Sequence, residues 1–433
     1  MGEGGRPADP SPFLRRVRIA NFTSMQDVDV TLGPLTILVG LNAAGKSNFL
    51  DALRFVSEVL TGSLAQAVAA RGGIAAVWRQ GVQEQATMRL TINLDVMVEA
   101  KDPAHRTGPS SWQAVNYGFD LRVTSDGDHG RMPVVDREWC HLGAGSLADG
   151  AAWIGDDGES DPVYPTGFVV ERGRVLRAPD YLHGPVAGPG RLLLPAAARW
   201  LPFAPVHAAL SSMSFHAVSP TVMRQVEVRS GQRRLGPSGE RLGEVLGHLA
   251  RQSPTTKARI DDYVAAIVPG AVGVDEYVLG RRSAVRLRMV DPGTGATREF
   301  DPESMSDGTL SAAGTLAALF QPDSLNGSIP LVGVEEPELG LHPTAAGVLL
   351  DALTEASEHV QVIAATQSAD LLDREDFQAD WARVVRMRDG VTTVDPVDEG
   401  SRAAVAANLA TLGDLLRSNQ LTPRVTTSSQ EDR

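Results

Sequence analysis

Residues 40–47 have the types and spacing of a phosphate-binding loop. They read Gly-Leu-Asn-Ala-Ala-Gly-Lys-Ser and fit the pattern G-x-x-x-x-G-K-S/T. Gly40 and Gly45 permit backbone angles and close approaches that a side chain would block. Successive N–H groups and the N-terminus of the following helix then face a chain of phosphates. In such a loop Lys46 reaches the β- and γ-phosphates, and the Ser47 hydroxyl binds Mg²⁺.

A run of acids supplies the metal-holding and water-placing groups that this chemistry needs. Residues 329–334 are wholly apolar, which is typical of a buried parallel strand. Glu335, Glu336 and Glu338 follow them. Ligands collect where the strands of an open α/β sheet end. The pattern therefore predicts that Glu335 holds Mg²⁺ and that Glu336 places the attacking water.

Two short polar segments complete the set. Residues 305–310 place Ser306 and Gly308 at the start of a helix, where free N–H groups can bind an anion such as a γ-phosphate. An ordinary helix cap would use the same residue types, although this segment shows no evident use within one subunit. Residues 366–368 (Thr-Gln-Ser) follow another apolar run, where a γ-phosphate sensor belongs.

The apolar pattern also predicts the elements that position these groups. Strands are expected at 13–20, 28–32, 35–39, 329–334 and 360–365, helices at 49–60, 310–320, 343–356 and 403–417, and a hairpin at 384–394. From residue 86 the period changes to two, which predicts antiparallel strands at 88–99, 115–123, 133–140 and 168–177. Helical spacing returns at 191–210, 240–252 and 256–268, followed by a strand pair at 275–289.

The composition limits the other functions open to the chain. Its 433 residues carry a formal net charge of −13, so DNA contact would need a local basic patch. Arginines gather in two segments, with Arg224, Arg229, Arg233, Arg234 and Arg241 in the first and Arg281, Arg282, Arg286 and Arg288 in the second. These arginines could bind phosphates or neutralise nearby acids.

Cysteine content and hydropathy point to a soluble protein of the cytoplasm. The single cysteine, Cys140, leaves no internal disulfide and no cysteine-based zinc site. No apolar run nears the roughly 20 residues that span a bilayer. We therefore expect a cytoplasmic protein with no membrane partner.

Together the motifs resemble the ABC-type ATPase heads of the SMC, RecF and OLD group, especially the compact bacterial AAA-family ATPases with an OLD-like core. The similarity is carried by IANFTSMQDVDVTLGPLTILVGLNAAGKSNFLDAL near the N-terminus, SMSDGTLSAAGTLAAL as the signature, VGVEEPELGLHP as Walker B and D-loop, AATQSADLLD as the switch and TLGDLLRSNQL as the closing helix. The resemblance implies an α/β fold: a P-loop NTPase head of the ABC type with a mixed central sheet, an antiparallel β subdomain and an α-helical lobe.

The resemblance also implies a role for each matching residue. ATP would be bound by Gly40, Asn42, Ala43, Ala44, Gly45, Lys46, Ser47 and Asn48, with Mg²⁺ on Ser47 and Glu335. Glu335 stands where the Walker B motif usually has an aspartate. Glu336 would polarise the water, with Lys46 and Gln367 as the other catalytic residues. Gln367 stands where relatives have a switch histidine, so it brings no positive charge to the γ-phosphate.

The signature segment implies a homodimer. Ser306 and Gly308 would bind the γ-phosphate of ATP held by the partner subunit, and His342 would lie in the D-loop at that interface. ATP binding would close the dimer, and hydrolysis would open it. The glutamine of the Q-loop would be Gln80 or Gln83.

Three function hypotheses stay open. The first is the ATPase subunit of a phage-defence or DNA-related system with a separately encoded effector such as a nuclease. The second is a RecF-like repair factor that clamps DNA with Arg281, Arg282 and Arg286. The third is a nucleotide-switched scaffold with negligible hydrolysis.

The expected organisation follows the motifs. It comprises a disordered tail at 1–12, the N-terminal half of the ATPase core at 13–85, an antiparallel β insertion at 86–190, a helical lobe with a strand pair at 191–300, the C-terminal half of the core at 301–421 and a disordered tail at 422–433. The interval between the two halves holds strands and short helices in place of the long coiled coils of SMC proteins. Residues 369–433 leave no room for the Toprim nuclease domain of OLD nucleases.

Overall fold

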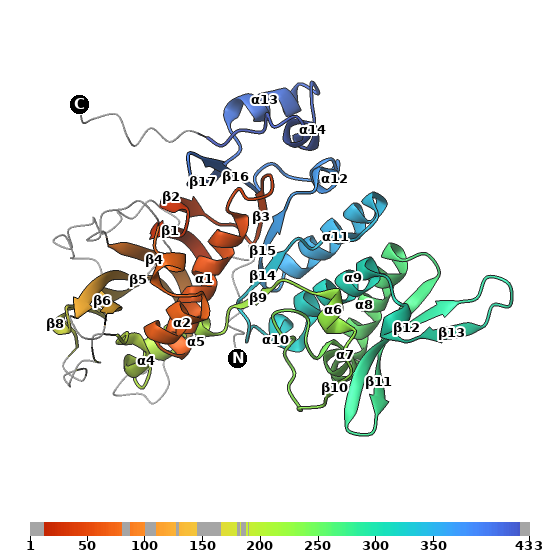
Figure 1. Cartoon of the computed structure of the whole chain (residues 1–433), viewed down its shortest axis with the longest axis horizontal. Coiled ribbons are helices and arrows are strands. Elements are labelled where there is room, and N and C mark those ends of the chain that lie inside the picture. The colour runs from red at the N-terminus through yellow and green to blue at the C-terminus, as the bar shows by residue number, and fades with distance from the viewer. Residues whose placement is uncertain are drawn as a thin grey trace. The chain divides into compact units, whose positions relative to one another are not determined.

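A computed structural model describes residues 13–79, 87–99, 110–126, 130–144, 166–179, 182, 188 and 190–424. The chain divides into two compact units, whose elements are labelled in Figure 1. The β-rich unit comprises Met1–Gly33, Asn48–Met213 and Met387–Thr393, and the α/β unit comprises Pro34–Ser47, Ser214–Arg386 and Val394–Arg433.

Five parallel strands form the main sheet of the α/β unit. Their order is β16 (Ala382–Arg388), β3 (Leu35–Val39), β15 (Gln361–Thr366), β14 (Leu331–Glu335) and β9 (Ser214–His216). β3 and β15 are buried along their whole length, as central parallel strands are. Because all five strands run the same way, their carboxyl ends meet at one edge, where ligands bind in such sheets. The strands predicted at 35–39, 329–334 and 360–365 are confirmed.

Strand β9 is not predicted by the sequence pattern. It has only three residues, too few to show a period of their own. It pairs in parallel with β14, so that His216 lies opposite Val334. The residues after His216 therefore reach the same sheet edge as Glu335.

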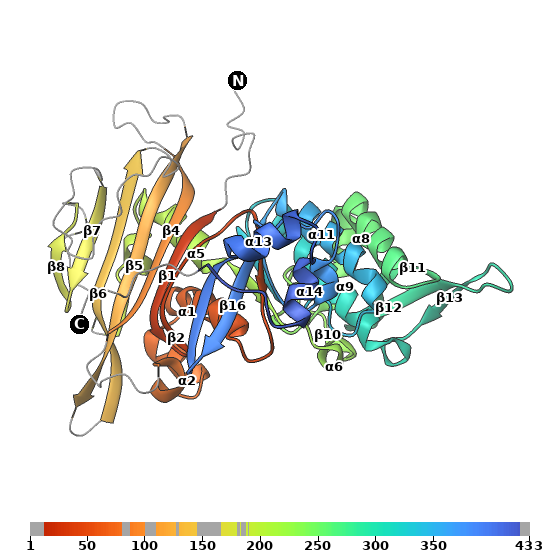
Figure 2. The same cartoon turned by 90° about the horizontal axis from the view of Figure 1, so that it is seen from above.

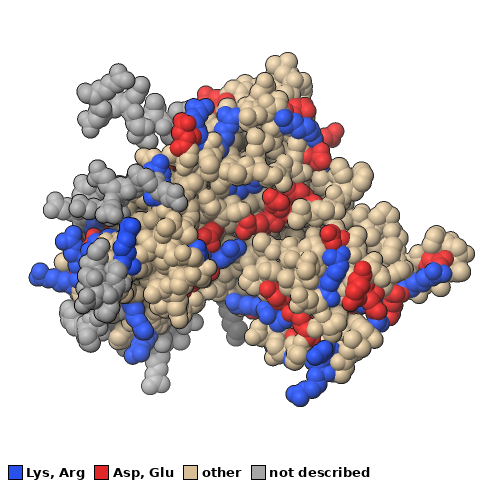
Figure 3. Space-filling model, viewed as in Figure 1, with Lys and Arg blue, Asp and Glu red and all other residues tan. Residues whose placement is uncertain are grey.

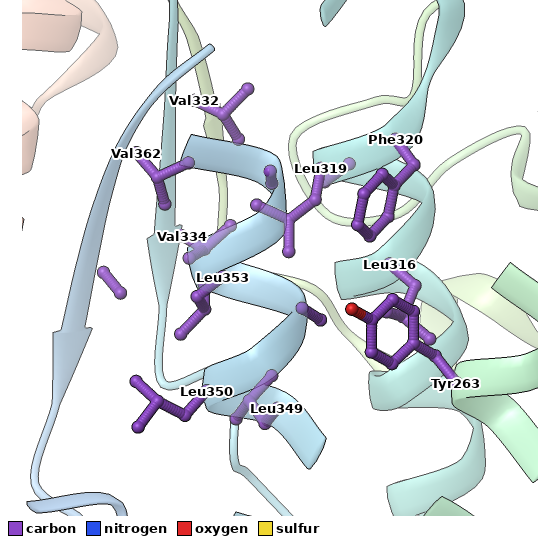
Figure 4. Packing of buried hydrophobic residues seen from close by; sticks show 14 of the residues in the cluster. Tyr263, Leu316, Leu319, Phe320, Val332, Val334, Leu349, Leu350, Leu353 and Val362 are labelled. Carbon is purple, nitrogen blue, oxygen red and sulfur yellow. The ribbon is translucent and has the colours of Figure 1, made fainter. Parts of the chain in front are cut away.

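The core of the α/β unit lies between β14, β15 and the helices α8 (Pro254–Ile267), α9 (Asp307–Phe320) and α11 (Ala346–Ser357). Helix α9 is buried at every position from Gly308 to Phe320, which fits a sequence of small and apolar residues in this stretch. Figure 4 shows side chains of these strands and helices pointing toward one another: Tyr263, Leu316, Leu319, Phe320, Val332, Val334, Leu349, Leu350, Leu353 and Val362.

One tyrosine joins the three helices. The Tyr263 ring of α8 stacks on Phe320 of α9, with the ring centroids 5.8 Å apart. The Tyr263 hydroxyl donates a hydrogen bond to Glu355 of α11 at 2.7 Å. The apolar ring and the polar tip of this side chain thus both have partners, as buried tyrosines require.

A smaller antiparallel sheet completes the α/β unit. Strand β12 (Arg282–Val290) pairs with β11 (Ala271–Leu279), β10 (Glu227–Val228) and β13 (Thr297–Phe300). Helices α7 (Leu242–Gln252) and α8 pack on this sheet. The strand pair predicted at 275–289 and the helices predicted at 240–252 and 256–268 are confirmed, whereas β10 and β13 are additional.

The β-rich unit is built on an antiparallel sheet. Its strand order is β8 (Arg174–Arg177), β7 (Thr166–Glu171), β6 (Gly130–Ala144), β5 (Ser110–Asp126), β4 (Met88–Glu99), β1 (Leu14–Phe22) and β2 (Met25–Thr31). The long strands β4, β5 and β6 run side by side in Figure 2, as their period-two pattern predicts. Helices pack on this sheet or on one another; they are α1 (Lys46–Thr61), α2 (Leu64–Ala70), α3 (Ile74–Val77), α4 (Leu194–Ala197) and α5 (Phe203–Ser211). Phe55 of α1 packs on Phe22 of β1, with the ring centroids 5.6 Å apart.

Two predicted elements of this unit are wrong in extent. The single strand predicted at 168–177 is the hairpin of β7 and β8, because Arg172 and Gly173 take positive φ and turn the chain. The helix predicted at 191–210 is two short helices, α4 and α5, separated by a segment that contains Pro202.

The C-terminal helix is also divided. The helix predicted at 403–417 is α13 (Glu399–Ala406) and α14 (Leu412–Arg417). Asn408 has a φ of 54°, and Thr411 starts α14 with a capping box to Asp414, so the chain ends one helix and begins another. The helix predicted at 343–356 begins as a 3₁₀ turn at Pro343–Ala345 before α11.

The remaining expectations concern tails and membranes. The predicted tails at 1–12 and 422–433 lie outside the described residues, apart from 422–424. No helix in the described part of the chain is long and apolar enough to cross a membrane.

Candidate nucleotide-binding site

The loop between β3 and α1 has the geometry that its glycines predict. Ala43 and Gly45 have φ of 61° and 103°, in the left-handed region that glycine takes readily. A Cβ on Gly40 would lie 2.3 Å from the carbonyl oxygen of Val385, so close packing against β16 requires this glycine. Helix α1 begins at Lys46, so its first free N–H groups lie beside the loop.

Lys46 is the buried cation of this loop. Its exposed fraction is 6%, and its Nζ donates hydrogen bonds to the carbonyl oxygens of Gly40 at 2.8 Å and Leu41 at 3.0 Å. Burial lowers the pKa of Lys46, while the three glutamates of residues 335–338 act to raise it. An ammonium group has three N–H donors. One donor is therefore left for a phosphate oxygen, and the acids at and just after the end of β14 are electrostatic neighbours of the lysine.

The other predicted loop residues divide into exposed and packed ones. Asn42 and Ser47 are exposed, whereas Ala44 is buried. The Asn48 side chain donates a hydrogen bond to Ser24 Oγ at 2.7 Å, within the β-rich unit. Ser47 is thus open to a cation, whereas the Asn48 amide already has a structural partner.

The chain turns sharply at Glu336. Strand β14 ends at Glu335, which lies opposite Ala365 of β15. Glu336 has a φ of 43°, and its N–H donates to the carbonyl oxygen of Ala365 at 2.7 Å. A non-glycine residue in this region costs on the order of 1–3 kcal/mol and persists only where its surroundings enforce it, often at functional positions.

Residues 366–368 lie against the acidic run. The Thr366 hydroxyl donates to Glu338 Oε1 at 2.5 Å, and the Gln367 N–H donates to the same oxygen at 3.3 Å. Burial raises the pKa of the Glu338 carboxyl, against the opposing effect of these hydrogen bonds. The structure therefore brings the predicted switch segment to the predicted acidic strand through Glu338, a residue to which the sequence pattern gives no role of its own.

Ser306 and Gly308 both have uses within their own subunit. Ser306 is the N-cap of α9, and its Oγ accepts a hydrogen bond from the Thr309 N–H at 3.1 Å. A Cβ on Gly308 would lie 2.2 Å from the carbonyl oxygen of Gly340. The expectation that this segment has no use within one subunit is therefore wrong. His342, predicted in the D-loop, caps the 3₁₀ turn that follows it.

Five of the nine arginines in the two arginine-rich segments pair with acids of the α/β unit, and Figure 3 shows acidic and basic side chains intermixed on one face. Arg286 pairs with Glu299 at 2.6 Å and with Asp301 at 2.9 Å. The other pairs are Arg224 with Asp307, Arg229 with Glu276, Arg234 with Asp323, and Arg288 with Asp261 and Asp275. Arg233, Arg241, Arg281 and Arg282 form no ion pair with any described residue. These pairs support the interpretation that most of the arginines neutralise nearby acids.

Ser47 and Glu335 are the residues that would hold Mg²⁺. No group of three or more His, Cys, Asp or Glu side chains in the described ranges could hold a metal ion. Mg²⁺ is usually bound by one or two protein ligands together with substrate phosphates and water. An exposed hydroxyl in the first turn of α1 and a carboxylate at the end of β14 fit that ligand set.

The Q-loop glutamine stays a prediction. Both candidates, Gln80 and Gln83, lie outside the residues that the structure describes. The end of β9 lies at the sheet edge where β14 ends. No local sequence pattern predicts this placement, because it depends on the pairing of β9 with β14.

Sequence comparisons match the parts of the chain that build this site. Residues 35–99 and 233–373 match the model of the family described as "AAA domain, putative AbiEii toxin, Type IV TA system". An OLD nuclease from Thermus scotoductus (strain ATCC 700910 / SA-01) is 46% identical over 44 residues. That stretch is 10% of this chain and 8% of the nuclease, so the chain spans only a small part of this relative.

Solved structures match nearly the whole chain. A structure of SmcHead bound to the C-winged helix domain of ScpA is 14% identical, with a TM-score of 0.52, and the match covers 90% of this chain and 100% of that one. An Smc head domain with an extended coiled coil, bound to the C-terminal domain of ScpA derived from Pyrococcus furiosus, is 13% identical, with a TM-score of 0.50 and coverage of 92% and 99%. The chain has the fold of an SMC-type ATPase head. The predicted resemblance to SMC- and OLD-like ATPases and the predicted P-loop α/β fold are thereby confirmed.

The helices in the described part of this chain are short, whereas one of the matched Smc head structures carries an extended coiled coil. The longest described helix is α1, with 16 residues. At such low identity the likeness to SMC heads shows the fold alone, so the roles of individual residues are argued from their geometry.

Proposed function

We propose that this chain is an ATPase that binds ATP and Mg²⁺ at the loop between β3 and α1. The observation that carries the proposal is the buried Lys46, which bonds to the carbonyls of its own loop and has three glutamates as electrostatic neighbours. A buried cation at the carboxyl edge of a parallel sheet, beside free helix N–H groups, suits a triphosphate.

The acids at the end of β14 would divide the chemistry between them. Ser47 and Glu335 would hold Mg²⁺, which supplies charge neutralisation at the β- and γ-phosphates. Glu336 would orient the attacking water and accept its proton as the water oxygen bonds to the γ-phosphorus and ADP leaves. The positive φ of Glu336, which the hydrogen bond to Ala365 holds in place, supports this role because it fixes the backbone from which the carboxylate extends.

Nucleotide titration tests the proposal directly. The wild-type chain should bind a fluorescent ATP analogue in the presence of Mg²⁺, and Lys46→Ala should lose this binding. Arg281→Ala removes one exposed positive charge without breaking an ion pair and serves as the matched control. A Lys46→Ala protein that binds ATP as the wild type does would remove the loop from the proposed site.

We further propose that two copies of the chain enclose ATP, with Ser306 and Gly308 of one copy facing the loop of the other. Ser306 and Asp307 are exposed at the start of α9, where N–H groups can meet an anion. Leu41 of the loop and Leu339 after the acidic run are 48% and 50% exposed. Both leucine side chains are therefore accessible to the surface of a second copy.

The proposed process is phage defence or another DNA-related task with a separately encoded effector such as a nuclease. The partial likeness to an OLD nuclease and the family description support this proposal. Co-purification of the chain with the product of a neighbouring gene would support this proposal. ATP-dependent binding to DNA without such a partner would favour the DNA-clamping hypothesis.

Two other candidate functions each have one supporting observation. Arg281 lies in the turn between β11 and β12 and Arg282 begins β12, and neither has an acidic partner among the described residues, so both could meet DNA phosphates. Gln367 places a neutral amide in the switch segment, which favours a nucleotide-controlled scaffold with negligible hydrolysis.

A further inference from the structure

Glu338 connects two parts of the site that lie far apart in the sequence. Its Oε1 accepts hydrogen bonds from the Thr366 hydroxyl at 2.5 Å and from the Gln367 N–H at 3.3 Å. The same Thr366 hydroxyl accepts a hydrogen bond from the Ser368 N–H at 2.9 Å. One carboxylate therefore anchors Thr366, the last residue of β15, and Gln367 after it, and the Thr366 hydroxyl in turn holds the Ser368 backbone.

These hydrogen bonds fix the backbone of Gln367 and leave its side chain accessible. Thr366 is fully buried, whereas Gln367 is exposed. The backbone of Gln367 is thus anchored on both sides while its side chain stays accessible at the carboxyl edge of the sheet. A side chain presented from a fixed backbone loses less entropy when it meets a ligand, since its starting geometry is already restricted.

Glu338 itself lies in a turn that backbone hydrogen bonds hold. The Leu339 N–H donates to the Glu336 carbonyl at 2.9 Å, and the Leu341 N–H donates to the Glu338 carbonyl at 2.9 Å. The second carboxylate oxygen, Oε2, is buried and has no hydrogen-bond partner among the residues that the structure describes. Its charge is also one of those that act on Lys46. Burying a carboxylate in this way is costly, and a glutamine could make the same two bonds at Oε1 without that cost.

We propose that Glu338 is a positioning residue, which acts through Thr366 and the Gln367 backbone to place the Gln367 side chain at the terminal phosphate. The inference rests on the proposed ATPase function and adds a residue to it. In this scheme Glu338 touches neither ATP nor the attacking water. Its removal should impair the action of Gln367, while the hydrogen bonds of Lys46 to Gly40 and Leu41 remain.

A double-mutant cycle with Gln367 tests this scheme. Glu338→Ala should lower kcat by about tenfold while the Kd for ATP stays within about twofold, because the loss affects a step after binding. In a Gln367→Ala background, Glu338→Ala should have almost no further effect, since both changes remove the same contribution. Glu338→Gln keeps an acceptor for Thr366 and Gln367 and should recover most of kcat. Glu358→Ala, an exposed glutamate of the same unit, is the control.

Thr366 provides a second, independent variant. Thr366→Val removes the hydroxyl and should lower kcat as Glu338→Ala does, whereas Thr366→Ser keeps the hydroxyl and should keep the wild-type kcat. Fully additive effects of Glu338→Ala and Gln367→Ala, or equal loss in the valine and serine variants, would show a merely structural role and overturn the inference. Thermal unfolding of each variant checks that the unit still folds.

Hydrogen exchange gives a readout that does not depend on turnover. ATP should slow amide exchange in residues 366–371 of the wild type, and Glu338→Ala should abolish this protection while ATP still binds. Binding without protection in the wild type would overturn the inference and leave the ATPase proposal standing. A wild type that binds no ATP would overturn both.

Discussion

A Cβ built on Gly308 would lie 2.2 Å from the carbonyl oxygen of Gly340. Real Cβ atoms do not approach a backbone carbonyl so closely, and Gly340 itself has a φ of 77° that suits glycine. The start of α9 and the turn after the acidic run are therefore fitted to each other within one subunit.

Gly308→Ala should for this reason destabilise the α/β unit even without nucleotide. The expected loss is about 1–3 kcal/mol, the usual effect of overpacking. Ser306→Ala should cost about 1 kcal/mol through loss of the helix cap. Urea unfolding of the monomer measures both changes. An unaltered unfolding midpoint for Gly308→Ala would show that the two backbones can separate at no cost.

Glu336→Gln should bind ATP but lose hydrolysis. Positioned general bases contribute about 10²–10⁴ in rate, and glutamine cannot accept the proton of the water. A phosphate-release assay measures the loss, with Glu358→Gln as the control on an exposed site of the same unit. Unchanged turnover would remove Glu336 from the catalytic role.

The same Glu336→Gln variant should accumulate as a dimer with ATP and Mg²⁺, since hydrolysis would no longer open the assembly. Sedimentation velocity with and without nucleotide checks this prediction. A variant that binds ATP and stays monomeric would contradict the proposed enclosure of ATP between two copies.

The elements around the loop are predictable because their signals are local. Strand β3 is five residues long and buried throughout, and α9 consists of small and apolar residues after Asp307, so composition alone marks both. The loop between β3 and α1 is equally local, since its two glycines and its lysine lie within eight residues.

Other features depend on contacts that no short pattern contains. Strand β9 has only three residues and is held by pairing with β14. Glu338 acquires its partner Thr366 from 28 residues further along the chain. The enforced φ of Glu336 likewise depends on its bond to Ala365 of the neighbouring strand. Such features require the fold to be known before they can be recognised.

A DNA-clamping function would depend on Arg281 and Arg282. Log affinity falls as log salt rises, and changing both arginines to alanine should make this slope shallower by about 2, one for each lost phosphate contact. Arg286→Ala should leave that slope unchanged, because Arg286 is occupied by Glu299 and Asp301 and lies over the Tyr277 ring. Fluorescence anisotropy over a salt series measures the slopes. A reduced slope for Arg286→Ala alone would show that its ion pairs open to bind DNA.

The stability of the β-rich unit should depend on pH through Glu138. This buried carboxyl accepts hydrogen bonds from the N–H groups of Leu193 and Leu194 and from the Tyr117 hydroxyl, and burial raises its pKa to about 7. Since the pKa is higher in the folded state, the stabilisation is full below the unfolded pKa and is lost as the pH rises through the folded value. The unfolding free energy, relative to Glu138→Gln, should therefore fall by about 2 kcal/mol between about pH 5.5 and pH 8. Urea titrations of both proteins measure this difference, and a difference that stays constant or grows with pH would show that the carboxyl is not buried as described.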